Sequence, residues 1–447
     1  MLCQFLALCA LLLALPGTRA GADTVRIDHV TVLPMTGADP LPDHSIVAED
    51  DLITMVAPSR SVATFEAERI IDGRDLFAIP GLVEMHGHVP SPRDAPQEAR
   101  DTLFLFVANG VTTVRNMLAQ PGHLELRRQI EREAIWAPAL YLAGWGFSGR
   151  AVSDEDAVRR VERQKAEGWD LLKIFDGLSL SRFQAITRRA HELGIDVAGH
   201  VPRAVGIHRA LHSGMRTIEH LDGYIEGLEG EGRRLPDSML REIARETRAA
   251  GVGVVPTMAV WEHLLAATPA DALRGHDELA YMPRHTAQAW RARLARAGDR
   301  TLRDRVKAML RLHDPQVIAN NRLRLLKIMD EEGVEILFGT DAPQYYSVPG
   351  FSVLREARRM QASGLSNRRI LQTATVDAGR HLGAGAARFG SIETGARADI
   401  VLLDGNPLED LGALREVRGV LLRGRWLSAE EIQRGLADIR QRMAADD

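Results

Sequence analysis

The chain has 447 residues, of which 26% are charged and 45% hydrophobic, and its formal net charge is -4. This length suits one large domain or two ordinary ones, and the composition is that of a globular protein. This charge gives no sign of nucleic-acid binding, which would need a concentrated basic face, so we expect no nucleic-acid partner.

The N-terminal segment differs from the rest of the chain. Residues 2–15 are almost wholly apolar and are followed by small residues up to Ala22. This pattern predicts a secretory signal peptide over residues 1–22, and therefore export to the periplasm or the medium. The run is shorter than the ~20 residues of a membrane-spanning helix, so we expect no membrane attachment after processing. A lipid anchor at Cys9 is the alternative.

The two cysteines, Cys3 and Cys9, both lie inside this apolar segment. After its removal the chain would form no disulfide and no thiolate metal site. Any metal ion would then be held by His, Asp, Glu or a group derived from Lys.

Short apolar runs separated by turns occur at both ends of the chain. They predict strands at residues 25–27, 30–33, 45–48, 52–56 and 70–73, and again at 395–403 and 417–422. We expect residues 23–79 and 386–430 to pair into one small β-sandwich domain around a central domain.

Between the ends, apolar β-rich runs alternate with amphipathic helical stretches such as 154–161 and 181–186. The expected strands are residues 83–89, 112–118, 139–143, 171–175, 196–201, 217–222, 252–258 and 335–341. Such alternation predicts an α/β fold with a parallel sheet, and eight units favour a (β/α)8 TIM-like barrel over residues 80–385. Residues 259–333 form a helical insertion, either a lid over the barrel mouth or a solvated decoration.

The stretch from Gly81 to Val89 ends an apolar run in two histidines, His86 and His88. In an extended strand, residues i and i+2 point to the same side, so both rings can face one point. Two neutral imidazoles make half of a site for a cation such as Zn²⁺. Two surface histidines near a turn are the alternative for this pair by itself.

Other ionisable residues also follow predicted strands, where the loops of a parallel barrel build its site. Each has a structural explanation alone, as a core histidine, a surface lysine or a capping aspartate. Their convergence at the strand ends of one barrel predicts a metal site formed by His86, His88, Lys173, His200, His220 and Asp341.

These motifs resemble the amidohydrolase superfamily, in particular its imidazolonepropionase-like and Xaa-Pro dipeptidase-like branch. The similarity covers nearly everything after the apolar N-terminal segment. It rests on residues 79–88, 217–220, 339–342, 374–375 with 382–383, 390–403 and 406–410. Together these motifs are specific for the superfamily and much less specific for substrate.

The resemblance implies two divalent metal ions, with Zn²⁺ as the expected metal. It assigns a first ion to His86, His88 and Asp341, a second to His200 and His220, and a bridging role to a Lys173 carboxylated on Nζ. A carbamate offers two oxygens, whereas an ammonium has no acceptor and repels cations. Asp341 would be the catalytic residue that moves the proton of the attacking water to the leaving amine.

The implied reaction is hydrolysis of an amide carbon–nitrogen bond by metal-activated hydroxide, with a dipeptide or an N-acyl amino acid as substrate. A mononuclear deaminase or cyclic-amidine hydrolase, with a structural Lys173, is the first alternative. A lactonase or phosphotriesterase would use the same hydroxide, and a barrel kept as a scaffold would need no full ligand set. The oligomeric state is left open, with a homo-oligomer among the possibilities.

Substrate contacts are less well defined by the sequence. Many dipeptidase-like relatives have His-x-His after the fifth strand, whereas Pro202 stands at the second of these positions here. Tyr224, Tyr345 and Arg203 follow strand ends where they could touch a substrate, with packing or ion pairing as the alternative. Arg115 is a further candidate for binding a substrate carboxylate.

Overall fold

The structure is a computed structural model that describes residues 24–133, 135–149, 153–264, 276–297, 315–383 and 388–445. The expected signal peptide at residues 1–22 lies outside these ranges. Within them, no helix combines the length and the apolar character needed to cross a bilayer.

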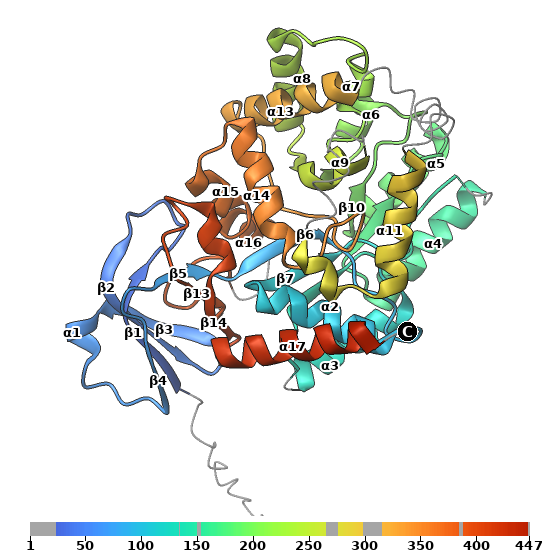
Figure 1. The fold of residues 1–447 in the computed structure, drawn as a ribbon. Helices are drawn as coiled ribbons and strands as arrows, with labels where there is room; N and C mark the ends of the chain where they lie inside the picture. Colours follow the sequence, from blue (N-terminus) through green and yellow to red (C-terminus); the bar gives the residue numbers. More distant parts are fainter. Residues whose placement is uncertain are drawn as a thin grey trace, which may run out of the picture.

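Strands from both ends of the chain form one eight-stranded sheet, in the order β15-β14-β13-β5-β1-β2-β3 with β4 beside β1. The two ends meet where β5 pairs antiparallel with β13, with Ile79 opposite Val401, and Figure 1 shows the blue N-terminal strands beside the red C-terminal ones. Because β5 also pairs with β1, hydrogen bonds join all strands into one sheet rather than the two of the expected sandwich. The bounds are β1 (Thr24–Val32), β2 (Leu41–Glu49), β3 (Leu52–Pro58), β4 (Arg69–Asp72), β5 (Phe77–Pro80), β13 (Ile400–Leu403), β14 (Val417–Leu422) and β15 (Arg425–Ser428).

The central part of the chain contains two parallel sheets, β6-β7-β8 and β12-β11-β10-β9. Their strands are β6 (Leu82–Gly87), β7 (Val111–Asn116), β8 (Ala139–Leu142), β9 (Leu171–Ile174), β10 (Asp196–Gly199), β11 (Thr217–Glu219) and β12 (Gly253–Val255). Isolated bridges join Ala143 to Leu171 and Val254 to Ile336. Seven of the eight expected strands are therefore present, and the α/β class is confirmed.

Residues 335–341 are not the strand that the sequence predicts. Leu337 N–H donates to the Val254 carbonyl at 2.9 Å and Met85 N–H donates to the Phe338 carbonyl at 2.8 Å, so the segment contacts both β12 and β6. However, Thr340 N–H donates to Glu84 Oε1 at 2.8 Å. A buried carboxylate thus replaces a neighbouring strand as the partner of this backbone, which interrupts any regular ladder.

Helices lie between and around the parallel strands (Figure 1). Their sequences explain their ends: α4 begins after Ser153, whose side chain accepts the Asp156 N–H, and ends at Gly168 with φ 86°. The helices expected at 154–161 and 181–186 are confirmed within longer ones. The bounds are α1 (Ser59–Val62), α2 (Pro96–Ala108), α3 (Pro121–Arg132), α4 (Asp154–Glu167), α5 (Leu180–Leu193), α6 (Ile207–Leu211), α7 (Tyr224–Gly227), α8 (Asp237–Ala249), α14 (Ser352–Ser363), α15 (Asn367–Thr373), α16 (Val376–Leu382), η2 (Leu411–Arg415) and α17 (Ala429–Ala445).

The expected insertion at 259–333 is helical where it is described. It contains α9 (Met258–Leu264), η1 (Asp277–Tyr281), α11 (Arg284–Ala297) and α13 (Pro315–Glu331). Residues 265–275 and 298–314 lie outside the described ranges. A lid over the site stays a prediction.

A substitution at Gly199, the last residue of β10, can test how closely the parallel strands pack. Gly199 has φ 140°, and a Cβ there would lie 2.3 Å from the Ile174 carbonyl oxygen. We expect Gly199→Ala to cost more than ~2 kcal/mol of unfolding free energy, because the clash is with backbone. Gly194→Ala, at φ 60° with nothing within 4 Å, should cost only about 1 kcal/mol. Urea unfolding measures both, and equal losses would contradict this account.

Candidate metal site

Four histidine rings lie in a row at the strand ends. The ring centroids are 5.4 Å apart for His88 and His86, 4.5 Å for His86 and His220, and 4.8 Å for His220 and His200. His86 is the last residue but one of β6, while His220 and His200 directly follow β11 and β10. The four histidines expected from the sequence therefore converge.

Asp341 and Lys173 join the same cluster. Asp341 Oδ1 lies 2.8 Å from His88 Nε2 and 3.6 Å from His86 Nε2. Lys173 Nζ lies 3.3 Å from His86 Nε2. One ligand atom each from His86, His220 and Asp341 falls within a 4.8 Å span. All six predicted metal ligands are thus brought together, with His220 closer to the His86–Asp341 group than the sequence assignment implied.

Three of the rings have a side-chain oxygen within hydrogen-bond distance of Nδ1. The contacts are His86 with Glu219 at 2.6 Å, His200 with Asp222 at 2.7 Å and His220 with Thr257 at 2.8 Å. Metal-binding histidines are usually held in this way, because the contact leaves Nε2 with a free lone pair. The donor set therefore fits divalent ions of the zinc type, with imidazole nitrogen and carboxylate oxygen as ligands.

Burial decides the protonation of these groups. It lowers the pKa of His86 and of His220 well below the ordinary value, and neighbouring cationic side chains lower both pKa values further. Burial also lowers the pKa of Lys173 to about 8, although Glu219 and Asp341 oppose that shift. The two histidines are therefore neutral, as metal ligands must be.

The backbone at the cluster is unusual for residues other than glycine. His220, Thr257 and Asp341 have φ values of 63°, 43° and 59°. A left-handed backbone at a non-glycine residue costs ~1–3 kcal/mol and concentrates at functional sites. This strain turns the side chains after β11 and β12, and after residue 340, towards one point.

Sequence reasoning missed the residues that hold the rings. Glu219, Asp222 and Thr257 were not singled out, although all three lie within the expected strands 217–222 and 252–258. The available signal was Glu219 itself, a charged residue directly before His220 inside an expected strand. Asp222 and Thr257 gave no such signal in the sequence, because Asp and Thr are common at strand ends and turns.

The three expected substrate contacts, Tyr224, Arg203 and Tyr345, have different surroundings in the structure. Tyr224 is buried in the apolar core, and its hydroxyl lies 3.0 Å from Thr247 Oγ1 in α8. Arg203 is half exposed, and its backbone N–H donates to Asp176. Tyr345 is partly buried after Asp341, and a substrate role for it and for Arg203 stays a prediction. The structure favours the packing alternative for Tyr224.

Arg115 does not face a substrate. Its guanidinium is buried and donates to Glu219 Oε1 at 2.8 Å, so the ion-pair alternative holds for this residue.

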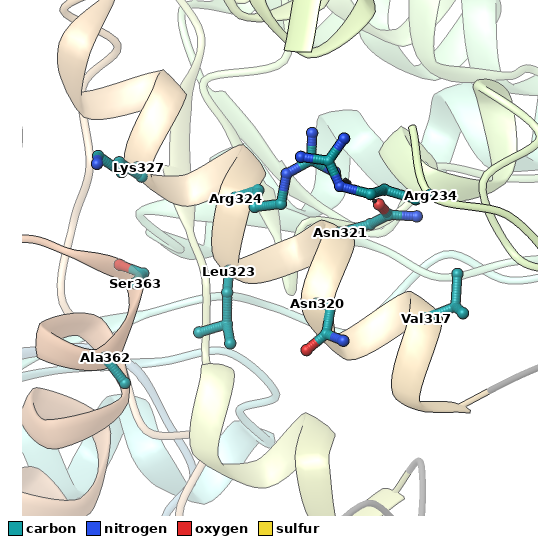
Figure 2. A pocket seen from close by; sticks show the side chains of 9 residues that line it. All are labelled: Arg234, Val317, Asn320, Asn321, Leu323, Arg324, Lys327, Ala362 and Ser363. Atoms are coloured by element: carbon teal, nitrogen blue, oxygen red, sulfur yellow. Dashed lines mark hydrogen bonds between the residues drawn. The ribbon is translucent and has the colours of Figure 1, made fainter. Parts of the chain in front are cut away.

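A separate hollow of about 410 Å³ lies between α13 and α14 (Figure 2). Its lining includes Arg234, Arg324 and Lys327 but none of the six candidate ligands. Arg234 and Arg324 both pair with Asp237, and Lys327 lies 3.9 Å from Glu331. Its cations are therefore already paired, and the hollow is not part of the histidine cluster.

The sequence profile of the amidohydrolase family matches residues 77–427. That range contains all six converging side chains, and the chain belongs to this family. The resemblance found in the sequence is thereby confirmed.

Known proteins with the same fold include a bottromycin amidohydrolase, with 24% identity, a TM-score of 0.70, and coverage of 94% of this chain and 91% of that one. A Xaa-Pro dipeptidase with bound methionine has 21% identity and a TM-score of 0.65, covering 91% of this chain and 100% of that one. The ochratoxinase of Aspergillus niger is 22% identical over 293 residues, which are 62% of this chain and 50% of the relative. The match thus spans half the length of that curated relative.

The position of Tyr224 leads to a test of its role. We expect Tyr224→Phe to lower the unfolding free energy by about 1 kcal/mol, because the variant loses the hydrogen bond to Thr247. The ratio kcat/KM for any hydrolysed amide should stay within about twofold of wild type, well inside a 1 kcal/mol change in barrier. A tenfold loss of kcat/KM with unchanged stability would restore Tyr224 as a substrate contact.

Proposed function

We propose that this chain is a metal-dependent hydrolase of amide carbon–nitrogen bonds that uses two divalent ions, with Zn²⁺ as the expected metal. The observation that carries the proposal is the row of four histidines beside Asp341 and Lys173, three of them held through Nδ1. The family supports the same conclusion. A scaffold protein would have no use for this ligand set.

The residues that would hold the ions follow from the cluster. His86, His88, His220, His200 and Asp341 would supply imidazole and carboxylate ligands, and Lys173, carboxylated on Nζ, would supply carbamate oxygens to the two ions. Its burial suits this role, since an amine must be neutral to add carbon dioxide. We also propose that residues 335–341 close β6–β12 into a (β/α)8 barrel, which the contacts on both sides of this segment support.

Two divalent ions supply Lewis acidity and lower the pKa of water. The protein's own contribution is then orientation and proton transfer. Asp341 is 13% exposed and lies beside both His88 and His86, where its carboxylate can accept a proton and pass it to a leaving amine. Its left-handed backbone and the contact with His88 fix this carboxylate at the cluster.

A dipeptide or an N-acyl amino acid is the proposed substrate class. The dipeptidase and ochratoxinase among the similar proteins support this class by their names alone. A mononuclear deaminase or cyclic-amidine hydrolase is the second candidate, and the close His86, His220 and Asp341 group is what favours it. We also propose that residues 1–22 are a signal peptide that directs export of the protein.

Asp341→Asn tests the proton-transfer role. We expect kcat to fall by at least ~10²-fold, because an amide cannot accept the proton, while bound metal persists in part. Asp404→Asn, an exposed carboxylate paired with Arg418, is the control and should keep full turnover. Near-normal turnover of Asp341→Asn on a panel of dipeptides and N-acyl amino acids would remove this role.

Metal counting separates the two candidate functions. Elemental analysis of protein loaded with Zn²⁺ and bicarbonate should give about two ions per chain, the number of a two-metal site. Lys173→Met should reduce this to one, because the bridge is lost. One ion in wild type, unchanged by the substitution, would support the mononuclear alternative.

A further inference from the structure

Behind the candidate site lies a buried polar group formed by Arg115, Thr217 and Glu219. Arg115 Nη2 donates to Glu219 Oε1 at 2.8 Å and Nη1 donates to Thr217 Oγ1 at 3.1 Å. The Thr217 hydroxyl in turn donates to Glu219 Oε1. The side chains of Arg115 and Glu219 are only 2% and 0% exposed, so water does not substitute for these contacts.

The other carboxylate oxygen of Glu219 faces His86. Glu219 Oε2 lies 2.6 Å from His86 Nδ1, a distance that requires a proton between the two atoms. The guanidinium and the hydroxyl both donate to Glu219 and hold it as an acceptor. The proton therefore resides on His86 Nδ1, and the lone pair of His86 Nε2 points to the side where Lys173 Nζ lies at 3.3 Å.

Burying the ion pair of Arg115 and Glu219 at this place costs free energy. A buried ion pair adds little stability relative to apolar packing of the same shape. The nearby layer of the central core is apolar, with Val83, Met85, Val255 and Leu337 in contact. Arg115 Nε also donates to the carbonyl of Met85, next to His86, at 2.6 Å. The group thus links β6, β7 and β11 around one imidazole, which indicates a role in geometry.

We propose that Glu219, held by Arg115 and Thr217, is a positioning residue that keeps His86 in the Nδ1-protonated tautomer and so creates its metal-binding lone pair. The inference rests on the proposed metal site and adds to it the residues that prepare one ligand. His200 and Asp222 form a similar contact, but their side chains are 22% and 21% exposed. Water can replace Asp222, whereas nothing replaces the fully buried Glu219.

Glu219→Gln tests the proposal with almost no change of shape. If the amide oxygen stays on Arg115 and Thr217, the amide nitrogen faces His86 and donates to Nδ1. The ring proton must then move to Nε2, which removes the metal-binding lone pair. We expect Zn²⁺ affinity, measured by chelator competition on the full chain, to fall by about 10–100-fold. Asp222→Asn should weaken it less.

Glu356→Gln is the matched control. Glu356 is another fully buried carboxylate, which accepts the backbone N–H groups of Met258 and Ala259 and, among the described residues, forms no hydrogen bond with a histidine of the cluster. Its substitution alters a buried carboxyl group that faces backbone donors instead of an imidazole. Zn²⁺ affinity should therefore stay within about twofold of wild type, well below the loss typical of a residue behind a ligand. An equal loss in both variants would overturn the proposal.

A second measurement does not depend on how the variant folds. In metal-free wild type labelled with ¹⁵N-histidine, two-bond NMR correlations identify the nitrogen that carries the proton, and His86→Gln assigns the signal. We expect Nδ1–H for His86, and Nε2–H would overturn the proposal. Wild type that binds no Zn²⁺ would instead refute the metal site, whereas equal binding by wild type and Glu219→Gln refutes only the role of Glu219.

Discussion

The contact between β6 and residues 335–341 is the interaction on which the site depends. It brings His88 and Asp341 together although 253 positions separate them in the chain. Asp341 N–H donates to the His86 carbonyl and His88 N–H donates to the Ala342 carbonyl, both at 2.7 Å. Glu84 reinforces this contact by accepting the N–H and the hydroxyl of Thr340. Burial raises the pKa of Glu84 to about 8, and these donors oppose the shift.

The composite sheet positions the same strand from its other end. β5 pairs with β13, and only Gly81 separates β5 from β6. Gly81 N–H donates to the Asp399 carbonyl at 2.8 Å, and a Cβ at this glycine would lie 2.1 Å from Thr112 Oγ1. The sheet built from both chain ends therefore continues directly into the strand that carries His86, and the close approach allows no side chain at the junction.

The middle of the row of histidine rings is buried, and its two ends are partly exposed. His86 and His220 are buried, whereas the His88 and His200 side chains are 17% and 22% exposed. Neutral imidazoles suit the two buried positions, since burial disfavours their charged form. Solvent reaches His88 and His200, the two ends of the row of rings, and Phe175 stacks on His200 with centroids 5.5 Å apart.

The sequence by itself determined the alternation of strands and helices, the pairing of the chain ends and the six side chains that converge. These features depend on local periodicity and on where an apolar run ends, so they can be recognised along one stretch of chain. Only the tertiary structure decided that 335–341 forms no ladder, that Tyr224 packs in the core, and that Arg115 holds Glu219 behind His86. Those outcomes depend on register and side-chain direction between strands far apart in the chain, which local patterns do not encode.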